Sequence, residues 1–306
     1  MSLTVPLSAW SDWTADPIGV LAVAASAGYL VAGWRCRRGD GVPVPRRIAF
    51  HLGCLGLFVL SCGPLTHYAT ELFWVRALQI TVLLYLVPLA LASGTPLTAI
   101  GAALPAPAAL RGIAALRSRP AHLLTHPAVA SGLLLAVPWI LIFTGWNVAA
   151  MRHGALDAVT RLILLMIGGL YFWTRIQADP VPRRWPQGLS LLVTLVESIG
   201  DGILGVVVWL GPVLYTGYYA ALGFTDADAL RTSQTIGAGM LWILADVIGV
   251  PFLMILLVAL RREDTATQAR VDAAQDAAEA AAPMDEAPPA GLWWEQDPRL
   301  RDRFRG

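Results

Sequence analysis

The chain has little charge for its length, and it has no lysine. Charged residues make up 14% of the 306 residues, and all 22 basic residues are arginine. A soluble domain carries about 25% charged residues. The chain therefore lacks the polar surface that a soluble domain needs on every side. Its net charge of +1 also gives no general attraction to nucleic acid.

Other signals are missing as well. Three cysteines do not make a disulfide framework. The first arginine, Arg35, follows the first apolar run, so the N-terminus lacks the basic start of a secretory signal. The sequence has no phosphate-binding glycine loop, no nucleophile elbow and no zinc-protease helix. The sequence therefore gives no support for an enzyme, and we predict that the chain is not one.

Long apolar runs occupy most of the chain. Hydrophobic residues make up 56% of it, and the mean hydropathy is +0.60. Runs of about 20 residues are long enough to cross a hydrocarbon core of about 30 Å as a helix. The sequence therefore predicts an all-α, polytopic transmembrane bundle of about seven spans, at residues 17–34, 48–66, 73–94, 128–147, 158–178, 188–213 and 235–260.

The arginines cluster in alternate connections. Five lie between residues 35 and 47, and three lie between residues 94 and 127. Further pairs follow the fifth and seventh spans. Because cytoplasmic loops carry the excess of arginine, the N-terminus is predicted outside and the C-terminus in the cytoplasm. We expect a short interfacial helix within the alanine- and proline-rich residues 95–127.

The predicted domains are a transmembrane domain, 1–262, and a cytoplasmic tail, 263–306. The tail begins rich in Ala, Asp and Glu, which favours a frayed helix or a disordered linker. It ends in an aromatic and basic patch, which would serve either as a membrane-surface anchor or as a docking peptide for a partner. The residues of this patch are Trp293, Trp294, Glu295, Asp297 and Arg299.

Polar residues inside the predicted spans are candidates for function, because such groups are costly in a membrane unless they are paired. One reading is a buried ion-pair network that fixes the register of the helices, with Arg76 or Arg161 paired to Asp201. The other is a path for protons or cations along the carboxylates. The predicted intramembrane cluster comprises Arg76, Gln79, Arg161, Glu197, Asp201, Gln234 and Asp246.

A second candidate set consists of soft metal ligands. Cys, Met and His side chains suit copper(I). None of them forms a tight motif, and a lone His or Cys in an apolar helix also occurs as a packed core residue. The candidates are His51, Cys54, Cys62, His67, Met151 and His153.

Several short motifs follow one another along the spans. They are Pro64-Leu65-x-x-Tyr68, Leu72-Phe73, Gly94-Thr95-Pro96-Leu97, His126-Pro127, Gly169-Leu170-Tyr171-Phe172-Trp173, Asp179-Pro180-Val181-Pro182, Tyr218-Tyr219 and Gln234-x-x-Gly237-x-Gly239-Met240-Leu241-Trp242. Together they resemble the CtaG family of cytochrome c oxidase assembly factors over most of residues 48–260. The end of the chain, 293–300, is similar to the tail of actinobacterial members.

The resemblance implies a multi-pass protein of the bacterial plasma membrane. Its implied role is to help a haem–copper oxidase mature, at the copper centre of the outward-facing domain. Oxidase subunits or copper chaperones would be its partners, and copper its cofactor or cargo. Two other functions remain open from the sequence: a transporter for copper or coupled to protons, and a scaffold subunit that docks to the respiratory complex.

The chain departs from the family at three places. Members commonly carry His-Met-x-Gln-His at the start of the third span, where this chain has Arg76-Ala77-Leu78-Gln79-Ile80. Arg161 stands near a further histidine of the family, and Ser233 replaces an aspartate. If those histidines hold copper, this chain lacks that site, and the arginines would instead compensate a carboxylate such as Asp201.

Overall fold

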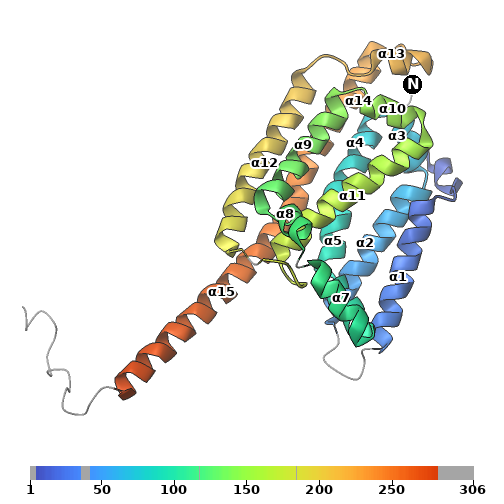
Figure 1. The fold of residues 1–306 in the computed structure, drawn as a ribbon. Coiled ribbons are helices and arrows are strands. Elements are labelled where there is room, and N and C mark those ends of the chain that lie inside the picture. Colours follow the sequence, from blue (N-terminus) through green and yellow to red (C-terminus); the bar gives the residue numbers. More distant parts are fainter. Residues whose placement is uncertain (1–4, 36–41, 117, 184, 282–306) are drawn as a thin grey trace, which may run out of the picture. The chain divides into compact units, whose positions relative to one another are not determined.

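The computed structural model of the chain describes residues 5–35, 42–116, 118–183 and 185–281. Every regular element within these ranges is a helix, which confirms the predicted all-α class. The chain forms two compact units, 1–260 and 261–306. The first unit contains the helical bundle with the candidate sites (Figure 1).

Among the described residues, six helical stretches are long and apolar enough to cross a membrane. The predicted span at 128–147 is instead two helices, α9 (Pro127–Phe143) and α10 (Trp146–Arg152), bent by 70° at their junction. Counting this pair as one broken span gives the predicted seven. The other six are α1 (Pro17–Arg35), α2 (Val44–Cys62), α4 (Phe73–Thr81) continued through η2 and α5 (Val87–Ser93), α11 (Gly154–Ile176), α12 (Gln187–Leu210), and α14 (Ala227–Gly239) continued through η3 into α15 (Ala245–Ala281).

Short helices connect the spans. The predicted interfacial region 95–127 contains three of them, α6 (Pro96–Ala103), α7 (Ala106–Leu116) and α8 (Arg119–Leu124). At the other end of the bundle lie α3 (Leu65–Glu71), α10 and α13 (Thr216–Ala221), as Figure 1 shows. A 3-10 turn, η1 (Leu7–Ser11), precedes α1. The orientation of the bundle across the membrane stays a prediction.

The predicted tail falls into two parts. Its first part is helical, because α15 continues to Ala281. The aromatic patch at 293–300 lies outside the described residues.

Two spans contain a π-helical segment, η2 (Val82–Leu86) and η3 (Met240–Leu244). Pro88 explains the first, because a proline ring clashes with the carbonyl four residues earlier, here Leu84, and the helix widens to relieve the clash. The two spans meet beside these segments, where the Thr81 hydroxyl donates to the Met240 carbonyl at 3.1 Å. Such bulges often mark functional sites in helices.

The displaced turn around Leu84 packs against α11 at Gly168. A Cβ atom at position 168 would lie 2.1 Å from the Leu84 carbonyl oxygen and 2.6 Å from Cγ of Pro88. Backbone cannot yield as a flexible side chain does, so only glycine fits. The neighbouring Gly169 would place its Cβ in open space, with nothing within 4 Å.

This pair of glycines gives a matched test of the packing. Gly168→Ala should destabilise the protein by about 1–3 kcal/mol, because overpacking forces the two spans apart. Gly169→Ala should be neutral or slightly stabilising, since alanine is the better helix former. Thermal unfolding of both variants in the same detergent measures the difference. Equal stabilities would show that α11 and the π-helical turn do not pack as described.

Candidate functional site

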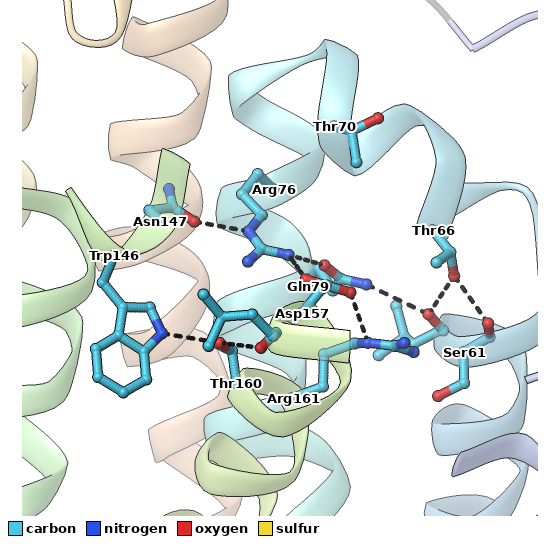
Figure 2. A network of polar contacts seen from close by, with 12 residues as sticks. Ser61, Thr66, Thr70, Arg76, Gln79, Trp146, Asn147, Asp157, Thr160 and Arg161 are labelled. Carbon is cyan, nitrogen blue, oxygen red and sulfur yellow. Dashed lines mark hydrogen bonds and ion pairs between the residues drawn. The ribbon is translucent and has the colours of Figure 1, made fainter. Parts of the chain in front are cut away.

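The first polar site is built around the Asp157 carboxylate, in the first turn of α11. Oδ1 of Asp157 accepts an ion pair from Nη1 of Arg76 at 2.5 Å, and Oδ2 lies 2.9 Å from Nε of Arg161. Figure 2 shows the two guanidinium groups converging on this one carboxylate. The arginine side chains are only 3% and 4% exposed. One carboxylate therefore forms ion pairs with two buried arginines.

A second carboxylate makes the site neutral. Asp16 lies just before α1, and its Oδ2 accepts from Nη2 of Arg161 at 2.7 Å. Its other oxygen accepts from the backbone N–H of Ile18 at 2.8 Å and so caps α1. Two arginines are thus matched by two aspartates. A balanced set is what burial requires, because an unpaired charge in a low-dielectric interior costs several kcal/mol.

Neutral side chains also bind Arg76. Nη1 donates to Oε1 of Gln79 and Nε donates to Oδ1 of Asn147, both at 2.9 Å (Figure 2). Nδ2 of Asn147 in turn donates to the Tyr215 hydroxyl at 3.2 Å. Burial raises the pKa of Tyr215 to about 12, so its phenol stays uncharged and donates to the Ile142 carbonyl. The network thereby also fixes the break between α9 and α10.

The predicted pairing of Arg76 or Arg161 with Asp201 is wrong. Both arginines bind Asp157, because that residue lies at the same level on α11 and one turn before Arg161. Asp201 lies elsewhere and accepts a hydrogen bond from the Tyr85 hydroxyl at 2.7 Å. The sequence did contain a signal for Asp157, namely the i,i+4 spacing to Arg161.

The second polar site lies between α11, α12 and α15. Glu197 forms an ion pair with Arg175 at 3.4 Å and accepts a hydrogen bond from the Tyr171 hydroxyl. Nη2 of Arg175 also donates to the Ser131 hydroxyl at 2.5 Å. Arg175 is 1% exposed and was not among the predicted site residues. It stands in the last turn of an apolar span, where an arginine is expected to reach the interface, so the sequence contained no signal that it is buried.

A small cavity adjoins this ion pair. It has a volume of about 40 Å³ and is lined by both Asp201 and Asp246, together with hydroxyl groups. Asp246 accepts from the Ser198 hydroxyl at 2.6 Å. The π-helical segments contribute directly, since Tyr85 belongs to η2 and Asp246 follows η3 by two residues. This brings together three of the predicted carboxylates, Glu197, Asp201 and Asp246.

Gln234, unlike the other predicted residues, binds backbone groups of a turn. Its Oε1 accepts from the Leu214 N–H at 2.7 Å, and its Nε2 donates to the carbonyls of Val208 and Pro212 at 2.8 and 2.9 Å. It therefore holds the turn that follows α12. The seven predicted residues thus divide into a paired network, a carboxylate cavity and a turn clamp.

The predicted metal ligands are spread over several environments. His51 shares a hydrogen bond with Ser26, His67 pairs with Glu71, and His153 precedes α11 as its N-cap residue. Cys54, Cys62 and Met151 are buried in the core. Among the described residues, no three His, Cys, Asp or Glu side chains form a group that could hold a metal ion.

Motifs that are far apart in the sequence meet in the structure. Asp179, which follows α11, accepts hydrogen bonds from the backbone N–H groups of Leu97 and Thr98 at 3.0 and 2.8 Å and so caps α6 from another part of the chain. Gly237 lets the ring of Phe73 approach its backbone. The motif residues are therefore contact partners of one another.

Comparison with known proteins gives a family match over most of the chain. The family described as cytochrome c oxidase caa3 assembly factor matches residues 27–263. Uncharacterized proteins of Mycobacterium bovis and Mycobacterium leprae are 27% and 24% identical, each over 85% of this chain. The chain spans only 41% of the length of these relatives. No solved structure matches.

A double-mutant cycle tests the paired network. Arg76→Met and Asp157→Asn should each destabilise the protein by about 3–5 kcal/mol, because each leaves a buried charge without its partner. The double variant should lose little more than the worse single one. Unfolding of purified protein in detergent measures all three. Arg152→Met, at the exposed end of α10, is the control and should cost less than about 1 kcal/mol. Additive losses would contradict the coupling.

Proposed function

Because the chain belongs to the family of cytochrome c oxidase caa3 assembly factors, we propose that it assists the maturation of a haem–copper oxidase, at the copper centre of its outward-facing domain. The observation that carries this proposal is the extent of the match, which runs from within α1 to the membrane part of α15. The match therefore covers the bundle as a whole rather than one motif.

The proposal does not place copper at the paired network. The positions where the resemblance implies histidines carry Arg76 and Arg161, and both guanidinium groups are bound to Asp157. A guanidinium offers no lone pair to a cuprous ion, so neither arginine can serve as its ligand. The arginines instead give the bundle a rigid end on which an oxidase subunit or a copper chaperone would dock.

Copper binding by other side chains remains a separate proposal. The soft candidates include Cys54 and Cys62 on one helix, α2, both as free thiols. Titration of the purified chain with copper(I) against a chromogenic competitor tests it. A stoichiometric site that is lost in Cys54→Ser and Cys62→Ser would make copper a cargo carried by this chain. Competition indistinguishable from buffer would restrict the chain to a role without bound copper.

A second candidate function is a proton-coupled transporter, and the carboxylate cavity between α12 and α15 is the observation that favours it. It predicts proton or copper flux in proteoliposomes that Asp201→Asn abolishes. An assembly factor need not show such flux.

Oxidase maturation is tested in membranes from a strain that lacks the gene. We expect reduced a-type haem absorbance and reduced cytochrome c oxidase activity, both restored when the gene is returned. Restoration by added copper alone would place the defect in copper supply. Loss that copper does not restore would place it in folding or docking of a subunit. An intact oxidase would overturn the proposal.

The terminal patch provides a test of partner contact. A chain truncated after Pro289 lacks Trp293, Trp294 and Arg299 but keeps the whole bundle. If the patch docks to the oxidase, the truncated chain should no longer co-purify with oxidase subunits, and the full chain should. Membrane insertion of both, measured by carbonate extraction, is the control. Equal co-purification would assign any docking to the bundle.

A further inference from the structure

A groove with a volume of about 340 Å³ lies between α1, α2 and α6. Its floor is formed by the buried rings of Tyr29 and Phe50, which stack with their centroids 4.1 Å apart. Its rim is formed by exposed apolar side chains, among them Val31 of α1 and Leu104, which follows α6. The groove therefore opens away from the packed core of the bundle.

The described residues leave this groove unfilled and make it apolar. A Cβ atom on Gly28, which lines the groove, would meet nothing within 4 Å. The lining contains one polar side-chain group, the Tyr29 hydroxyl, and that group donates to the Gly94 carbonyl at 2.6 Å. A surface of this kind does not hold ordered water. Because α1 and α2 are both long and apolar enough to cross a membrane, the apolar material available to fill the groove is the acyl chain of a lipid.

Two arginines stand at one end of the groove. Arg46 and Arg47 lie one turn before Phe50 on α2, so they share a face of that helix with it. The backbone is close to the groove as well, since a Cβ atom on Gly94 would lie 2.5 Å from Cβ of Phe50 and 3.1 Å from the Arg46 carbonyl oxygen. Both arginines are half-buried.

Within the part of the chain that the structure describes, no carboxylate forms an ion pair with Arg46 or Arg47. Asp179 is the acidic group at this end of the groove, and it lies within electrostatic range of Tyr29, as both arginines do. Its two oxygens already accept from the first backbone N–H groups of α6. Two guanidinium groups are therefore available to an anion beside a slot that fits a hydrocarbon chain.

We propose that the groove is a binding site for one anionic phospholipid. One acyl chain lies between α1, α2 and α6, and the phosphate is bound by Arg46 and Arg47 at the end of the groove. A guanidinium matches the geometry of a phosphate, because it donates two parallel hydrogen bonds to it. Basic groups at the membrane surface also favour anionic over zwitterionic lipids. The site does not depend on the role in oxidase maturation.

Native mass spectrometry of the full chain tests the site by counting bound lipids. The chain is purified in detergent and mixed with dioleoyl phosphatidylglycerol or with dioleoyl phosphatidylcholine, which have the same acyl chains and differ in net charge. We expect one phosphatidylglycerol per chain, bound about tenfold more tightly than phosphatidylcholine, because a hydrogen bond between charged groups is worth at least that factor.

Removing the two charges tests the phosphate contact. The double variant Arg46→Gln, Arg47→Gln should bind phosphatidylglycerol about tenfold more weakly, at the level of phosphatidylcholine. The matched control is Arg261→Gln, Arg262→Gln, which removes two exposed arginines at the end of the last span and should leave the preference unchanged.

Filling the groove tests the acyl-chain contact. Gly28→Leu places a side chain in the open space and should abolish the one-to-one complex, with no cost to the helix because leucine is the better helix former. Gly33→Leu is the control on the same helix, since its Cβ would also meet nothing within 4 Å but the residue does not line the groove. Elution of both variants as folded protein shows that any loss belongs to the groove.

Three results would overturn the proposal. The first is a wild-type chain that binds the two lipids equally or binds neither. The second is a Gly28→Leu variant that retains phosphatidylglycerol as the wild type does, because the arginines would then bind a headgroup without the groove. The third is a dimer of the wild type that Gly28→Leu alone dissociates, because the occupant would then be a second copy of the chain. The oxidase phenotype enters none of these measurements.

Discussion

The bundle depends on one acidic group that pairs with two buried arginines. Asp157 joins Arg76 of α4 to Arg161 of α11, and Arg161 is also bound by Asp16 at the start of α1. Three spans are thus fixed at the same end by buried ion pairs. Replacing the carboxylate would leave positive charge in an apolar interior, which costs more than most packing defects. The break between α9 and α10 is positioned by the same set, through Asn147.

Charge balance separates the two polar sites of the bundle. The network at Asp157 contains two cations and two anions, so its charges balance. The site at Asp201 contains three carboxylates and one arginine, so its formal charges do not. The first arrangement suits a structural role. Hydropathy alone would not distinguish the two polar sites, because both consist of ionisable side chains within apolar spans.

The sequence predicted the spans well because hydropathy over about 20 residues reports directly on membrane helices. It also selected Arg76, Gln79 and Arg161, which do form one network. It assigned them the wrong carboxylate, because counting rise along a helix gives depth but not the direction in which a side chain points. The π-helical segments were not predicted, because a proline such as Pro88 can also kink or end a helix. Arg175 was missed because it stands at the end of a span, where an arginine is expected to reach the interface.

Asp179 connects two parts of the bundle that are far apart in the sequence. It belongs to the connection between α11 and α12, yet its carboxylate holds the first backbone N–H groups of α6. This one side chain therefore ties α6 to the connection between α11 and α12. A partner that pushes on the surface helices would strain the connection to α12, and α12 carries both Glu197 and Asp201. Contact at these helices would then reach α12 through a single side chain.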